Sequence, residues 1–170
     1  GEYELFQKAV RTLKEQSGGY VSYLKGLSSL IDYDLKQARK HLEQAIVNDQ
    51  NVIETRLLYL NTFDDGNSLT DLEKIQIENL ITETESISGY VTQYSKASLY
   101  FRAAMIFEKH KHNMLSAKYY GLALDEFDDE DTKIIATLKY ANALFKTGRI
   151  IRASDIMMDL LSDVDDQKLK

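Results

Sequence analysis

Residues 100–123 read YFRAAMIFEKHKHNMLSAKYYGLA, and the stretch from Thr137 to Leu161 repeats the same arrangement of small and large apolar residues. Small side chains recur where two antiparallel helices must approach closely, and larger apolar side chains fill the space between the helices. Such a helical pair cannot bury its apolar face alone, so it stacks on its neighbours. The positions that carry this pattern are Tyr100, Ala103, Ala104, Phe107, Ser116, Tyr120 and Ala123 in the first stretch, and Tyr140, Ala141, Leu144, Gly148, Ala153, Met157 and Leu160 in the second.

The composition of the whole chain favours long helices. The 170 residues contain no proline, and 44% of them are hydrophobic, which suits one globular domain. Without proline, helices can continue uninterrupted. No alternating run rich in Val, Thr and Ile indicates a strand. We therefore predict an all-α fold of stacked antiparallel helical hairpins, forming a single domain over residues 1–170.

Several classes of function fit the composition poorly. There is no cysteine, so disulfides and thiolate metal sites are excluded. The net charge of −6 argues against sequence-independent binding to DNA or RNA, and we expect no nucleic-acid partner. No apolar run approaches the ~20 residues that span a bilayer, so we expect no membrane insertion. The compartment stays open between cytoplasm and bacterial cell envelope.

Helical periodicity and turn residues divide the chain into about nine helices. An amphipathic helix over residues 1–17 is expected to cap the stack, since a terminal apolar face must be covered. Thr70 and Glu73 form a capping-box pattern at the start of another helix. The final helix is expected to end at Leu161, before acidic residues that suggest a solvated terminus. Four hairpins follow the first helix, over residues 18–50, 51–86, 90–130 and 131–163.

The last two hairpins resemble tetratricopeptide repeats. In that family the first helix of each unit carries a large residue, a pair containing a small residue and then an aromatic, and small residues recur on the second helix. Residues from Ala97 and from Ile134 match this pattern, and residues 18–50 match it more weakly through Gly26, Ala38, Leu42 and Ala45. The resemblance implies an α-solenoid whose concave groove is lined by the first helix of each hairpin. A plain helical bundle remains the alternative, because small residues at helix contacts occur there too.

No pattern of catalytic or metal-binding residues emerges. His110 and His112 are two residues apart, whereas metal-ligating pairs on a helix favour three or four. The acidic run Asp128–Asp131 is typical of a solvated loop and a helix cap. Signatures of nucleophile elbows and of phosphate-binding loops are absent. We therefore expect no enzymatic activity, no catalytic residue, no cofactor and no metal.

The resemblance implies a partner-binding surface for another protein. Aromatic, methionine and leucine side chains would supply apolar contact area, cations would hold carboxylates, and an amide would bond a peptide backbone. That mixture suits an extended peptide or an amphipathic helix. Tyr20, Tyr23 and Leu27 also match groove positions, although a place in the core explains them better. A self-oligomerisation module and, less well, a metal-binding or enzymatic bundle are the alternatives. The residues implied to bind the partner are Phe101, Arg102, Met105, Leu138, Lys139 and Asn142.

Overall fold

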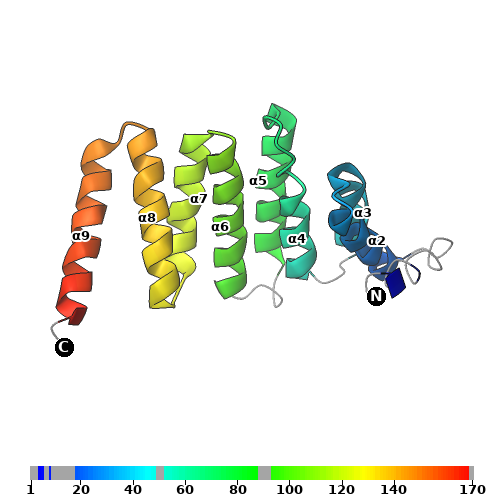
Figure 1. The fold of residues 1–170 in the computed structure, drawn as a ribbon, viewed down its shortest axis with the longest axis horizontal. Coiled ribbons are helices and arrows are strands. Elements are labelled where there is room, and N and C mark those ends of the chain that lie inside the picture. Colours follow the sequence, from blue (N-terminus) through cyan, green and yellow to red (C-terminus); the bar gives the residue numbers. More distant parts are fainter. Residues whose placement is uncertain (1–3, 6–7, 9–17, 49–51, 88–92, 169–170) are drawn as a thin grey trace. The chain divides into compact units, whose positions relative to one another are not determined.

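The structure is a computed structural model that describes residues 4–5, 8, 18–48, 52–87 and 93–168. This part of the chain is entirely helical, which confirms the predicted all-α class. It holds eight helices, labelled as in Figure 1. The amphipathic helix predicted within residues 1–17 lies almost wholly outside the described residues. The helices are α2 (Gly19–Ile31), α3 (Leu35–Val47), α4 (Val52–Asn61), α5 (Asp71–Ser86), α6 (Gln93–Lys109), α7 (Asn113–Glu126), α8 (Glu130–Lys146) and α9 (Ile150–Lys168).

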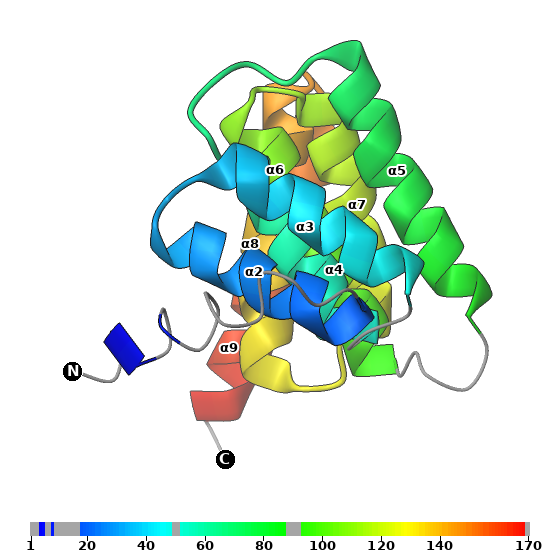
Figure 2. The same ribbon diagram turned by 90° about the vertical axis from the view of Figure 1, so that its right-hand side faces the viewer.

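The helices fall into two compact units, Gly1–Thr84 and Glu85–Lys170. In the first unit, α2 and α3 form a hairpin, which can be followed in Figure 2. Gly26 lets the two helices approach: a Cβ at this position would lie 2.6 Å from the Cγ of Leu42. Leu42 itself is fully buried, with Ala38 and Ala45 beside it on α3. Small residues therefore do hold this hairpin together, as its sequence pattern predicts.

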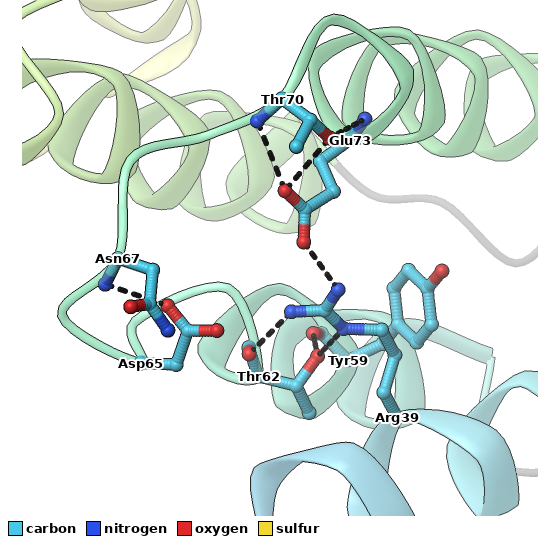
Figure 3. A network of polar contacts seen from close by, with 7 residues as sticks. All are labelled: Arg39, Tyr59, Thr62, Asp65, Asn67, Thr70 and Glu73. Atoms are coloured by element: carbon cyan, nitrogen blue, oxygen red, sulfur yellow. Dashed lines mark hydrogen bonds and ion pairs between the residues drawn. The ribbon is translucent and has the colours of Figure 1, made fainter.

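A polar network centred on Arg39 links α3, the end of α4 and the start of α5 (Figure 3). Its Nη1 donates to Glu73 Oε1 at 2.6 Å, and its Nη2 donates to the carbonyl oxygen of Thr62 at 2.8 Å. The guanidinium also lies 4.0 Å from the ring centre of Phe63. Arg39 lies close in sequence to Lys36 and Lys40, and a basic cluster of this size is usually interpreted as solvated helix surface. For Arg39 that interpretation is wrong, because partners distant in sequence surround the side chain.

The two predicted helix starts have the expected caps. Glu73 N donates to Thr70 Oγ1 at 3.2 Å, and Thr70 N donates to Glu73 Oε2 at 3.0 Å, which completes the capping box. At α8, the Asp129 carboxylate accepts from the backbone N–H groups of Asp131 and Thr132. This cap starts the helix at Glu130.

Two helix ends differ from the prediction. The sequence pattern predicts a helix from Val52 to Phe63, but the helix ends at Asn61. Thr62 N and Phe63 N donate to carbonyls three residues back, which tightens the chain into a turn. The final helix continues to Lys168, so the predicted end at Leu161 is wrong. Acidic residues alone do not stop a helix, and neither glycine nor proline follows Leu161.

In the second unit, each helix from α6 to α9 packs against the next one along the chain (Figure 1). The small residues of the sequence pattern lie between these helices, where Ala103, Ala104 and Ala123 are fully buried. Ala141 and Ala153 are buried as well, which agrees with their predicted close contact. Gly148 differs: its φ of +82° and the open space around it show that it makes the turn after α8 and not a helix contact.

Candidate partner-binding surface

The six residues implied to bind a partner lie on two helices of the second unit, three on α6 and three on α8. Phe101 is half-buried, and its ring meets the edges of Tyr120 and Phe127 with ring centres 5.3 Å and 5.9 Å apart. Its ring therefore contributes to packing between α6 and α7. Met105 and Leu138 are the two apolar members that reach the surface, with 37% and 42% of each residue exposed.

Arg102 is half-buried, and its Nε atom has no hydrogen-bond partner within the described residues. Burial lowers the pKa of this guanidinium, since desolvation penalises its charged form. That Nε atom is itself shielded from solvent, so a carboxylate or a carbonyl of a ligand would contact the terminal nitrogens of the guanidinium. Of the three polar residues implied to bind a partner, Arg102 fits that role best.

Lys139 and Asn142 instead meet a carboxylate of their own chain, Glu108 on α6. Lys139 Nζ donates to Glu108 Oε2 at 3.2 Å, and Asn142 Nδ2 donates to Glu108 Oε1 at 3.2 Å. Lys146 Nζ adds a bond of 3.0 Å, and the hydroxyl of Tyr120 donates at 2.8 Å. Side chains from α7 and α8 thus converge on one carboxylate of α6, and we call this group of five residues the Glu108 cluster.

The environment of the Glu108 cluster shifts the ionisation of its members. Burial by itself raises the pKa of Glu108, but the hydrogen bonds from Lys146, Tyr120 and Lys139 outweigh burial and hold the pKa below its usual value. Burial, together with the neighbouring carboxylate, raises the pKa of Tyr120. Glu108 is therefore ionised and Tyr120 protonated at neutral pH. The cluster is a stable arrangement of charge that joins successive helices.

Sequence reasoning missed Glu108. The residue lies three positions after Met105, so helical spacing does place it near the implied groove positions of α6. Its donors on α8 are 31, 34 and 38 residues away in sequence. No local pattern connects residues at such separations. Only the packing of α6 and α8 around α7 brings them together.

Beside these residues, α8 and α9 enclose an open groove of about 330 Å³. Its walls include Leu138 and Asn142, two of the implied binding residues. Phe145, which lines this groove on α8, is 59% exposed, and Met158, the residue after the lining residue Met157 on α9, is 68% exposed. Single exposed apolar residues are ordinary, whereas a continuous set beside a groove indicates a binding surface. The groove is lined by Leu138, Ala141, Asn142, Phe145, Ala153, Ser154 and Met157.

The remaining candidates differ in burial. Tyr23 is buried, as expected of a core residue, and its hydroxyl donates to Glu54 at 2.6 Å. Tyr20 stacks on the Tyr23 ring but is 58% exposed, so the expected place in the core is wrong for Tyr20. His112 precedes α7, where its ring meets the edge of Phe107. Within the described ranges, no three His, Asp or Glu side chains are grouped as metal ligands would be. In the same ranges, no helix combines the length and the apolar character needed to cross a bilayer.

No protein-family model matches the sequence, and no curated protein is detectably similar to it.

Proposed function

We propose that this protein is a non-enzymatic scaffold of tetratricopeptide-like helical repeats, and that it binds a peptide or an amphipathic helix of another protein. The exposed apolar set on α8 and α9, beside the groove that includes Leu138 and Asn142, is the observation that carries the proposal. Such a set of side chains loses contact with water only when another surface covers it. The consecutive packing of α6 to α9 and the buried alanines at their contacts support the repeat assignment.

The chemistry of the surface indicates what the ligand would contact. Met105 and Leu138 offer adaptable apolar area, and Arg102 offers the terminal nitrogens of a half-buried guanidinium. The Glu108 cluster already holds Lys139 and Asn142, so these two side chains are less free to bind a ligand. Apolar contact would therefore supply most of the affinity, and Arg102 would orient the ligand.

Site-specific photo-crosslinking in native cells tests this proposal. A benzophenone amino acid replaces Met105 or Leu138 in separate variants, and the matched control replaces Leu122 on α7, which is similarly exposed at 36%. The proposal predicts that the Met105 and Leu138 variants capture the same polypeptide, and that the Leu122 variant does not.

An affinity measurement with the captured polypeptide completes the test. Arg102→Gln should weaken binding about tenfold or more, since it removes a charge-assisted hydrogen bond. Leu122→Ala should leave the affinity unchanged. No captured polypeptide, or equal capture at Leu122, would contradict the proposed surface.

A further inference from the structure

The loop between α4 and α5 contains the only aspartate of the chain that directly precedes a glycine, Asp65 before Gly66. Both residues are exposed. The loop is anchored at its two ends, because the carbonyl oxygen of Thr62 accepts from Arg39 and Thr70 belongs to the capping box of α5. The turn around Gly66 is therefore held between two fixed points while it stays open to water.

The side chain of Asp65 is folded back along its own backbone (Figure 3). Its Oδ1 atom accepts from the backbone N–H of Asn67 at 2.9 Å, a contact that aspartates commonly make two residues ahead in a turn. The ring that this bond closes includes the amide nitrogen of Gly66. The side-chain carbon Cγ of Asp65 is thus held beside that nitrogen.

The amide nitrogen of Gly66 is open to reaction. Gly66 has no side chain to shield it, and its φ of +81° is a conformation that glycine adopts without strain. A Cβ at this position would meet no other atom within 4 Å. In the part of the chain that the structure describes, Gly66 N donates to no backbone carbonyl. The nitrogen can therefore approach Cγ of Asp65 without breaking an existing backbone hydrogen bond.

We propose that Asp65 is a modification site at which aspartate converts spontaneously to isoaspartate. The Gly66 nitrogen attacks Cγ of Asp65, and a succinimide ring closes. Oδ2 leaves as water, taking one proton from the Gly66 amide and one from solvent. The N–H of Asn67 stabilises the negative charge that develops on Oδ1 during the attack, and the turn holds the two reacting atoms together.

Water then opens the succinimide at one of its two carbonyl carbons. Attack at Cγ restores aspartate, whereas attack at the backbone carbonyl carbon of Asp65 leaves the chain running through Cγ, which is isoaspartate. The water released in the first step is taken up in the second, so the mass of the protein is unchanged. The loop between α4 and α5 gains one backbone carbon, and the carboxylate moves to the former main-chain position.

Asp32 provides a matched comparison within the same chain. It is exposed in the turn between α2 and α3, and the next residue, Tyr33, also has a positive φ, of +58°. The amide nitrogen of Tyr33, however, donates to the carbonyl oxygen of Leu30 at 3.1 Å. Attack on Asp32 would break this hydrogen bond and would bring a bulky side chain toward the reacting carbon. The same reaction is therefore expected at Asp65 and not at Asp32.

Ageing of the purified 170-residue protein at physiological temperature and pH tests the proposal. Tryptic peptides are analysed at increasing times by electron-transfer dissociation, which cleaves the additional backbone bond of an isoaspartate and so assigns it to one residue. Isoaspartate is expected to accumulate at Asp65 over weeks, through a succinimide that is one water lighter, while Asp32 stays unmodified. An Asp65 that remains aspartate throughout, or equal conversion at Asp32, overturns the proposal.

Three variants test the geometry of the turn. Gly66→Ala places a methyl group beside the attacking nitrogen and should slow isoaspartate formation severalfold. Asn67→Pro removes the backbone N–H that bonds Asp65 and should slow it as well, whereas Asn67→Ala keeps that N–H and should leave the rate unchanged. Far-UV circular dichroism checks that each variant keeps its helical content. Equal rates in Asn67→Pro and Asn67→Ala overturn the role of the turn, and none of these measurements depends on a binding partner.

Discussion

Replacing Gly26 with alanine tests how tightly α2 and α3 pack. In a helix interior, alanine is favoured over glycine by about 1 kcal/mol, so an unhindered substitution would stabilise the protein. At this position the new Cβ would lie 2.6 Å from Leu42 Cγ and 2.7 Å from its Cδ2. Leu42 is fully buried and has little room to move. Overpacking of this kind costs roughly 1–3 kcal/mol, so we expect a net loss of about 1 kcal/mol.

The sign of that effect should reverse when Leu42 is shortened. Leu42→Ala removes the two atoms that the new Cβ would strike, and the next neighbour, Leu42 N, is at an ordinary 3.5 Å. Leu42→Ala alone should cost about 2–5 kcal/mol through the cavity it leaves. On that background, Gly26→Ala should stabilise the protein by about 1 kcal/mol. The difference between the two backgrounds predicts a coupling energy of about 2 kcal/mol.

Urea unfolding followed by far-UV circular dichroism measures all four proteins of this cycle. Constant slopes of the unfolding free energy against urea would show that the variants unfold between comparable states. The reasoning is refuted if Gly26→Ala stabilises the wild-type protein, or if its effect is the same in both backgrounds. Either result would mean that Gly26 is not required for the close approach of the two helices.

Three further predictions concern the Glu108 cluster, the Arg39 network and the buried core of the second unit. Because the folded state lowers the pKa of Glu108, the ionised carboxylate stabilises the protein at neutral pH, and this stabilisation is lost as pH falls through the folded-state pKa. Glu108→Gln should therefore weaken the loss of stability at acidic pH, measured as the urea midpoint of unfolding at a series of pH values. An acidic part of this profile that is unchanged by the substitution would contradict the prediction. Arg39→Met should lower the free energy of unfolding by about 1–3 kcal/mol, because it leaves the Thr62 carbonyl and Glu73 without this partner. The control Lys36→Met, on the exposed face of α3, should change it by no more than about 0.5 kcal/mol in the same urea titration. Ala104→Leu should cost roughly 1–3 kcal/mol by overpacking, and a neutral thermal midpoint would show that α6 has room at this position.

Local features of the fold could be predicted from the sequence where the cause is itself local. The reciprocal pattern of Thr70 and Glu73 needs only three residues of separation, and the structure contains both of its hydrogen bonds. The alanines at helix contacts follow from periodicity and are buried as expected. The end of α9 could not be predicted, because no breaker follows Leu161 and acidic composition alone decides nothing.

Long-range polar contacts were beyond sequence reasoning. Arg39 looked like one member of a solvated cluster, yet residues 23 and 34 positions away hold it. Lys139 and Asn142 looked available to a ligand, yet both donate to Glu108. A charged residue can be assigned to a surface from its type and periodicity, but its partner depends on the packing of helices that are distant in sequence. The partner-binding role of the six implied residues stays a prediction.

The Glu108 cluster has a consequence for how fast a ligand arrives. Its two lysines and one carboxylate sum to a single positive charge spread over hydrogen-bonded groups. Such a patch attracts an approaching anion only weakly, so long-range steering adds little to the encounter rate. Under the proposed function, ligand association at this surface should therefore gain little electrostatic acceleration and change little with ionic strength. Differences among ligands would appear chiefly in how long each one stays.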